Sequence, residues 1–133
     1  MEIKNKNSNH VNVVLINEDG LICLVSRKDD HTDFGFIGGK LDGNETYEDA
    51  AIRETKEETG LNIINLKMVF AMHRNGCMGK TFIGEYSGEI NYDTEKEPHI
   101  VKWGEISEAI DGKFGYWNGL VKETLESLEL KFR

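Results

Sequence analysis

The chain has few of the residues that cross-link secreted proteins or anchor proteins in membranes. It has only two cysteines, Cys23 and Cys77, and they form no CxxC pair, so neither a disulfide framework nor a structural zinc site is expected. No run of about eighteen apolar residues occurs, and residues 1–10 are polar with no apolar stretch behind their lysines. The sequence therefore predicts neither secretion nor membrane insertion, and a reducing cytoplasm fits it best.

Basic residues are also in the minority. The sequence has 16 Lys and Arg against 24 Asp and Glu, a net charge of −8, so general electrostatic attraction to a nucleic acid polymer or an anionic membrane is not expected. A phosphate-bearing small molecule would need a bridging cation. With 133 residues, 38% of them hydrophobic, the chain is long enough for one packed core, and we expect a single domain over residues 1–133.

The pattern of apolar residues predicts a mixed α/β domain. Strands are expected at residues 11–17, 21–25, 63–73, 81–90 and 100–103. The first two are separated by Glu18-Asp19-Gly20, which predicts a β-hairpin, and Asn75-Gly76 predicts a turn later in the chain. Apolar residues at helical spacing from Leu120 to Leu128 predict a C-terminal helix, with Asn118 as its candidate N-cap.

The strongest helix signal lies at residues 46–59. Thr46 can cap its N-terminus with Asp49 three residues later, and Gly60 followed by Leu61 fits a C-terminal cap. The segment before this helix, residues 34–43, has four glycines among apolar residues. Such a density indicates either close approach of the backbone to other groups or unusual torsion angles.

Three carboxylates share one face of this predicted helix. Glu54, Glu57 and Glu58 fall within an arc of roughly 100°. Their charges repel one another, and the helix dipole disfavours anions in the last turn. A bound cation would offset both effects, and oxygen ligands suit Mg²⁺ or Mn²⁺. Acidic helix faces are also often simply solvated, with Lys56 here as a surface partner, so the cluster alone leaves both interpretations open.

The spacing from the glycines to the acidic cluster resembles the signature of the Nudix hydrolases. Gly39 is followed after five residues by Glu45 and after seven more by the run Arg53-Glu54-Thr55-Lys56-Glu57-Glu58-Thr59-Gly60-Leu61. Thr55 is the one departure, because an aliphatic residue is usual there. The resemblance implies an α/β/α sandwich with a mixed sheet. It also implies metal-dependent hydrolysis of a diphosphate linkage in a nucleoside diphosphate joined to another group.

The resemblance further implies which residues hold the metal. Glu57 and Glu58 are expected to coordinate Mg²⁺ or Mn²⁺. Gly39 is expected to contribute its backbone carbonyl. Arg53 should pair with one of the glutamates, and Glu45 should support the loop or a second metal.

The general base has two candidate positions. Glu54, a further metal ligand or the base itself, is the first candidate because it lies one turn from the metal-binding glutamates. Related proteins often take the base from a later loop, where Glu97 or Glu95 is the second candidate. The histidines His31, His73 and His99 are expected to be surface or strand residues rather than ligands.

The sequence predicts the substrate less closely than it predicts the metal ligands. Gly38-Gly39-Lys40 resembles a stretch of MutT-type members, which cleave nucleoside triphosphates to monophosphate and diphosphate, although Ile37 replaces their usual proline. The expected substrate contacts are Lys40 and Arg27 to phosphate and Phe34 to the base. Other candidate base-stacking aromatics are Phe36, Tyr116 and Trp117.

Two alternatives to a triphosphate hydrolase stay open. The first is a pyrophosphatase for ADP-ribose or another nucleoside diphosphate derivative, although the glycine-proline signature of many ADP-ribose pyrophosphatases is absent and Pro98 is the only proline. The second is a regulatory module that binds nucleotide without cleaving it. A monomer or a homodimer is expected in either case.

Overall fold

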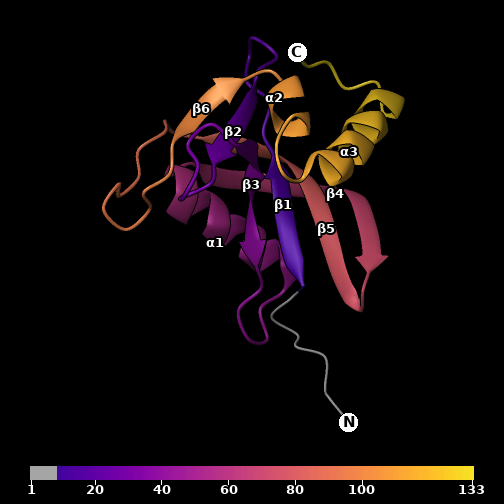
Figure 1. The fold of residues 1–133 in the computed structure, drawn as a ribbon, viewed down its shortest axis with the longest axis horizontal. Coiled ribbons are helices and arrows are strands. Elements are labelled where there is room, and N and C mark those ends of the chain that lie inside the picture. The colour runs from indigo at the N-terminus through magenta and orange to yellow at the C-terminus, as the bar shows by residue number, and fades with distance from the viewer. Residues whose placement is uncertain (1–8) are drawn as a thin grey trace.

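A six-stranded sheet forms the centre of the molecule in the computed structural model, which describes residues 9–133 (Figure 1). Its strands are β1 (His10–Val14), β2 (Ile22–Ser26), β3 (Phe34–Lys40), β4 (Asn62–Arg74), β5 (Cys77–Ser87) and β6 (Val101–Gly104). Across the sheet they lie in the order β4-β5-β1-β3-β2-β6. The β1 and β5 pair is parallel and the other neighbours are antiparallel, so the sheet is mixed as expected.

Helices cover both faces of this sheet (Figure 1). They are α1 (Tyr47–Thr59), α2 (Ser107–Ile110) and α3 (Gly115–Ser127). In β1, Val11 and Val13 pack with α1, whereas Val14 packs with α3. Strands buried on both faces show a nearly continuous apolar run, which explains the sequence pattern and confirms the α/β/α sandwich. No helix within residues 9–133 is long and apolar enough to cross a membrane.

The predicted hairpin of the first two strands is correct at its turn and wrong beyond it. The chain reverses where the Asn17 N–H donates to the Leu21 carbonyl at 2.9 Å, and Gly20 has a φ of 79°. However, β3 lies between β1 and β2 and pairs with both. The apolar pattern of a strand buried on both faces does not encode which strand lies beside it, so the glycine-rich β3 could not be placed from sequence.

The helix α1 forms as its capping residues predict. The Asp49 N–H donates to Thr46 Oγ1 at 3.0 Å, and Gly60 ends the helix in the left-handed region with a φ of 80°. In contrast, Asn118 is not a cap. It lies inside α3, buried, and its Nδ2 donates to the Ala109 carbonyl at 2.9 Å. That carbonyl belongs to α2, a four-residue helix too short to give a periodic signal.

Candidate active site

The strand β3 brings two glycines against the acidic face of α1. The Gly38 N–H donates to Glu58 Oε1 at 2.9 Å. A Cβ at Gly39 would lie 2.5 Å from Glu54 Oε1, and one at Gly38 would overlap the Val11 carbonyl of β1. Neither glycine has a positive φ. At Gly38 the obstructing atom belongs to the backbone, so lack of space rather than an unusual torsion angle requires glycine there, whereas a side chain at Gly39 would displace the Glu54 carboxylate.

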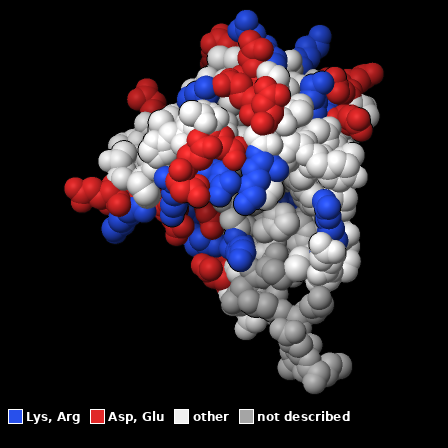
Figure 2. All heavy atoms as spheres, viewed as in Figure 1, with Lys and Arg blue, Asp and Glu red and all other residues white. Residues whose placement is uncertain are grey.

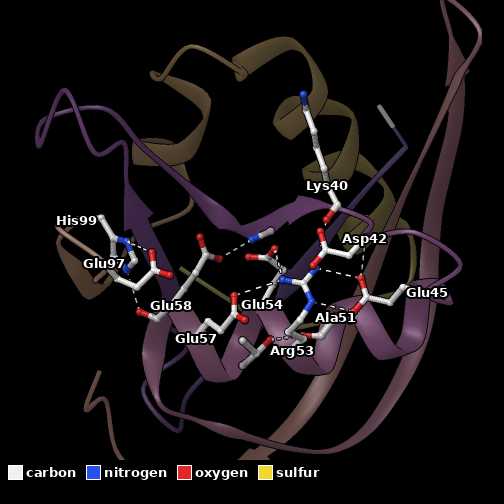
Figure 3. A network of polar contacts seen from close by, with 12 residues as sticks. Lys40, Asp42, Glu45, Ala51, Arg53, Glu54, Glu57, Glu58, Glu97 and His99 are labelled. Atoms are coloured by element: carbon white, nitrogen blue, oxygen red, sulfur yellow. Dashed lines mark hydrogen bonds and ion pairs between the residues drawn. The ribbon is translucent and has the colours of Figure 1, made fainter. Parts of the chain in front are cut away.

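Arg53 organises the acidic residues around it (Figure 3). Its Nε and Nη2 donate to the two oxygens of Glu45 at 2.7 and 2.9 Å, a bidentate pair. Its Nη1 donates to Glu54 Oε1 at 2.9 Å and to Glu57 Oε2 at 3.2 Å. The hydrogen bond from Arg53 lowers the pKa of Glu45. Arg53 thus pairs with the glutamates as expected.

The position of Glu45 fits one of the two roles considered for it. Its Oε1 accepts a hydrogen bond from the Asp42 N–H at 3.0 Å, in the loop between β3 and α1. The same oxygen accepts a hydrogen bond from Arg53. Glu45 therefore links this loop to the arginine, which is the loop-supporting arrangement.

Burial makes the charges of two glutamates costly. Burial raises the pKa of Glu58 well above its usual value, and the charges of Glu54 and Glu97 raise it further. Burial also raises the pKa of Glu54, although Arg53 opposes this effect. Glu57 is half exposed. A buried carboxylate is stabilised by a nearby cation, so this end of α1 suits a positively charged ligand.

The carboxylate oxygens of Glu54, Glu57 and Glu58 are the type of ligand that a hard divalent cation binds, but in this structure they do not surround a single point. Within residues 9–133, no three His, Cys, Asp or Glu side chains are grouped closely enough to hold a metal ion. Glu54 and Glu57 each use one oxygen for Arg53, and Glu58 uses one for Gly38. The second carboxylate oxygen of each forms no hydrogen bond or ion pair with another described residue. Carboxylate and carbonyl oxygens are what Mg²⁺ and Mn²⁺ prefer.

Glu97 approaches the cluster from the loop between β5 and β6 (Figure 3). Its Oε2 lies 3.2 Å from Lys28 Nζ and 3.7 Å from His99 Nδ1. The expectation for His99 was wrong, because this histidine is 4% exposed, lies outside any strand, and its Nε2 is 2.8 Å from the Glu58 carbonyl oxygen. Sequence reasoning missed Lys28 and His99 because both reach the site through contacts between distant segments.

A cavity of about 380 Å³ extends from the acidic cluster between the sheet and α3. Glu58, Gly39 and Lys40 line it together with Arg27 and Phe34. Further lining residues include Asn12, Phe36, Phe114, Trp117 and Asn118. The volume suits a small organic ligand. The structure thus brings the three predicted substrate contacts, Arg27, Phe34 and Lys40, to one cavity, which two of the predicted metal ligands, Gly39 and Glu58, also line.

These three side chains have different surroundings. Arg27 forms ion pairs with Asp29 at 3.2 Å and Asp33 at 3.6 Å. Lys102 Nζ lies 4.3 Å from the centre of the Phe34 ring. The side chain of Lys40 points away from the carboxylates, while its carbonyl accepts a hydrogen bond from Arg53 (Figure 3).

One of the candidate base-stacking aromatics lies outside this cavity. Phe36 and Trp117 line it, but Tyr116 does not, and Tyr116 is 70% exposed. Its ring lies 5.6 Å from the guanidinium carbon of Arg74. Tyr116 therefore does not contribute to this cavity, whereas the two residues that follow it in α3, Trp117 and Asn118, both line it. Asn12, Phe114 and Asn118 were missed because the apolar pattern does not show which strand and helix faces enclose a cavity.

Comparison with known proteins identifies the family. The model of the NUDIX domain matches residues 6–122. The chain belongs to the Nudix family. This Nudix chain is 29% identical over 118 residues to the NAD-capped RNA hydrolase NPY1 of Saccharomyces cerevisiae, covering 80% of this chain and 31% of that protein. It is 46% identical over 50 residues to a putative 8-oxo-dGTP diphosphatase of Bacillus subtilis, covering 38% of this chain and 33% of that protein.

The fold comparison agrees with the family assignment. A solved MutT structure, from work on Aliivibrio salmonicida and Vibrio cholerae, superposes with a TM-score of 0.73 and 21% identity. The match covers 90% of this chain and 97% of the MutT chain. The matched segments make up 31% of the yeast protein and 33% of the Bacillus protein, so what this chain matches is only about a third of the length of each relative.

Proposed function

We propose that this Nudix protein is a Mg²⁺- or Mn²⁺-dependent hydrolase that cleaves a nucleoside triphosphate to a monophosphate and diphosphate. The observation that carries the proposal is the cavity of about 380 Å³, which Glu58 and Gly39 line together with Arg27, Phe34 and Lys40 and whose volume suits a small organic ligand. Similarity to the putative 8-oxo-dGTP diphosphatase supports the triphosphate assignment over the 50 matched residues.

Each residue of the cluster has a proposed role. The metal would be held by Glu57, Glu58 and the Gly39 carbonyl, with Glu54 beside them. A metal held there would supply positive charge that neutralises phosphate oxygens and lowers the pKa of water. Glu54 accepts the proton of the attacking water as the new oxygen–phosphorus bond forms and diphosphate leaves with the electrons of the broken bond. Because burial raises the pKa of Glu54, this carboxylate is a stronger base than an exposed glutamate.

Surface charge is consistent with binding through local contacts. On the face seen in Figure 2, acidic and basic side chains are interleaved rather than separated into one basic surface. With a net charge of −8, long-range attraction does not concentrate a polyanion near the protein. The phosphates would therefore be held by local contacts, namely a metal at the glutamates and the few cations near the cavity.

A second candidate is a pyrophosphatase for ADP-ribose or another nucleoside diphosphate derivative. The match to the NAD-capped RNA hydrolase favours it, because this match covers 80% of the chain. A regulatory module without hydrolysis is the third candidate. Loss of activity usually removes glutamates of the motif, whereas this chain keeps Glu54, Glu57 and Glu58.

A substrate panel separates these candidates. Nucleoside triphosphates, 8-oxo-dGTP, ADP-ribose and NAD are incubated with the protein and Mg²⁺ or Mn²⁺, and the released monophosphate and diphosphate are quantified. We expect diphosphate from triphosphates and no turnover in chelator. Turnover confined to ADP-ribose or NAD would support the second candidate. Tight nucleotide binding in chelator without hydrolysis after metal addition would support the regulatory module.

Replacing Lys40 tests the phosphate contact. We expect Lys40→Ala to weaken nucleotide binding about tenfold in the presence of Mg²⁺, because one partly solvated ammonium contributes on the order of 1 to 3 kcal/mol to a charged hydrogen bond. Titration calorimetry measures the change. Lys67→Ala, on the exposed surface of β4, is the matched control. Equal affinities for wild type and Lys40→Ala would remove this contact and leave the hydrolase proposal in place.

A further inference from the structure

The loop between β5 and β6 is fastened to the end of α1 that carries the acidic cluster. The last carbonyls of a helix have no partner within the helix. Here the Thr59 carbonyl accepts the Asn91 N–H at 2.8 Å. The Glu58 carbonyl accepts the Nε2–H of His99, with 2.8 Å between the nitrogen and the oxygen. One contact comes from the start of the loop and the other from its end.

His99 is the buried anchor of this loop. Among residues 91–100, His99 alone is buried, and the residues from Asp93 to Lys96 are exposed. Its ring stacks on Tyr92 with 5.0 Å between ring centres and 15° between planes. The Tyr92 hydroxyl donates to the His99 carbonyl at 2.8 Å. Tyr92 therefore holds His99 twice: its ring packs on one face of the imidazole, and its hydroxyl binds the backbone carbonyl of the same residue.

The two nitrogens of this ring face two parts of the active site (Figure 3). A carbonyl oxygen only accepts hydrogen bonds, so Nε2 carries a proton in its contact with Glu58. The opposite nitrogen, Nδ1, then lies 3.7 Å from Glu97 Oε2. One ring thus spans from the backbone of a proposed metal ligand to the second candidate base. Among the described residues, the Glu97 carboxylate also forms an ion pair with Lys28, whose side chain is 61% exposed. Such exposed pairs hold geometry weakly.

We propose that His99 is a positioning residue, which fixes the Glu97 carboxylate relative to Glu54 and Glu58 by tying its loop to the end of α1. The expected effect on kcat rests on the proposed function, whereas the expected effect on the order of the loop rests on the geometry alone. Displacing a reacting group by about 1 Å can cost about a hundredfold in rate. The tie reaches the backbone carbonyl of Glu58 and not its carboxylate, so we expect the effect to fall on kcat more than on KM.

A double-mutant cycle tests the connection between His99 and Glu97. We expect His99→Phe, which keeps the stacking on Tyr92 and loses the N–H donor, to lower kcat about 10- to 100-fold with KM changed less than about threefold. In a Glu97→Gln background the same change should lower kcat no further, because His99 acts through Glu97. His99→Gln restores a donor and should recover part of the lost rate.

The matched control is Lys56→Gln. Lys56 Nζ donates to the Gly60 carbonyl at 3.3 Å, so it is also a side chain bonded to the same end of α1, but it forms no contact with Glu97 among the described residues. Its kcat should stay within about twofold of wild type. Thermal melting of each variant identifies any that fails to fold, in which case His99→Gln carries the test.

Hydrogen exchange of residues 91–100 gives a readout that does not need turnover. Exchange there should be faster in His99→Phe than in wild type and unchanged in Lys56→Gln. Unchanged exchange in His99→Phe, an equal loss of kcat in the Glu97→Gln background, or an unaltered kcat in Glu97→Gln would each overturn the positioning role. A wild-type protein that hydrolyses no member of the panel would instead refute the proposed function, and exchange would still decide whether His99 fixes the loop.

Discussion

Glu54→Gln is expected to lower kcat by about two to four orders of magnitude while nucleotide affinity stays nearly unchanged. The amide cannot accept the proton of the attacking water. The substitution preserves the size of the side chain in a site where Glu54 Oε1 would lie only 2.5 Å from a Cβ at Gly39. It also preserves an oxygen that can accept the hydrogen bond from Arg53 Nη1. Steady-state kinetics gives kcat, and calorimetry gives the affinity for nucleotide.

Glu97→Gln is the comparison for this result. Its carboxylate lies at the edge of the cluster, beside Lys28 and His99, and we expect a smaller loss of about 10- to 100-fold. A larger loss in Glu97→Gln than in Glu54→Gln, with metal affinity unchanged, would assign the base to the later loop. A weaker metal affinity in Glu54→Gln would make Glu54 a ligand rather than the base.

The parts of the site that sequence predicted are those specified by local spacing. The cap at Thr46, the end at Gly60 and the acidic face are all set within one helix, where positions three and four residues apart share a face. The family signature then placed Gly39 and Arg53 beside that face, and the structure has both in contact with Glu54. Short-range geometry therefore accounts for the predicted part of the cluster.

The parts that sequence missed depend on contacts between distant segments. The hydrogen bond of His99 to the Glu58 carbonyl joins residues 41 positions apart. Asparagine is a common N-cap residue, but Asn118 lies within α3, where it is buried and bonded to α2. β3 lies between two strands that are joined by a tight turn. None of these arrangements follows from local propensity, because each is decided by how the helices and strands pack together.

The second large effect concerns stability, and its sign should depend on metal. In chelator at neutral pH, Glu58→Gln is expected to melt several degrees above wild type, because the variant avoids the free-energy cost that burial imposes on the Glu58 carboxyl group and leaves an oxygen able to accept the Gly38 N–H. With Mg²⁺ at a hundredfold excess over its dissociation constant, wild type should gain about 2.7 kcal/mol and the variant much less. Adding Mg²⁺ should therefore raise the melting temperature of wild type more than that of Glu58→Gln, which reduces or reverses the advantage of the variant.

The pH dependence of this difference follows from the raised pKa of Glu58. The unfolded chain releases this proton near pH 4.3, whereas the folded chain holds it to higher pH. The contribution of Glu58 to stability is therefore fully present below the unfolded pKa and is lost as pH rises through the folded pKa.

Melting curves of wild type and Glu58→Gln are recorded in chelator from pH 4 upward. The direct comparison isolates the effect of Glu58 from that of carboxylates such as Glu45, whose pKa is lowered and whose contribution to stability changes with pH in the opposite direction. We expect the advantage of the variant to grow with pH and to level off once Glu58 is ionised in the folded protein. An advantage that does not change with pH would mean that the buried charge is not its cause. Equal Mg²⁺-induced shifts in the two proteins would mean that the ion acts by general screening, and Glu58 would then not be a metal ligand.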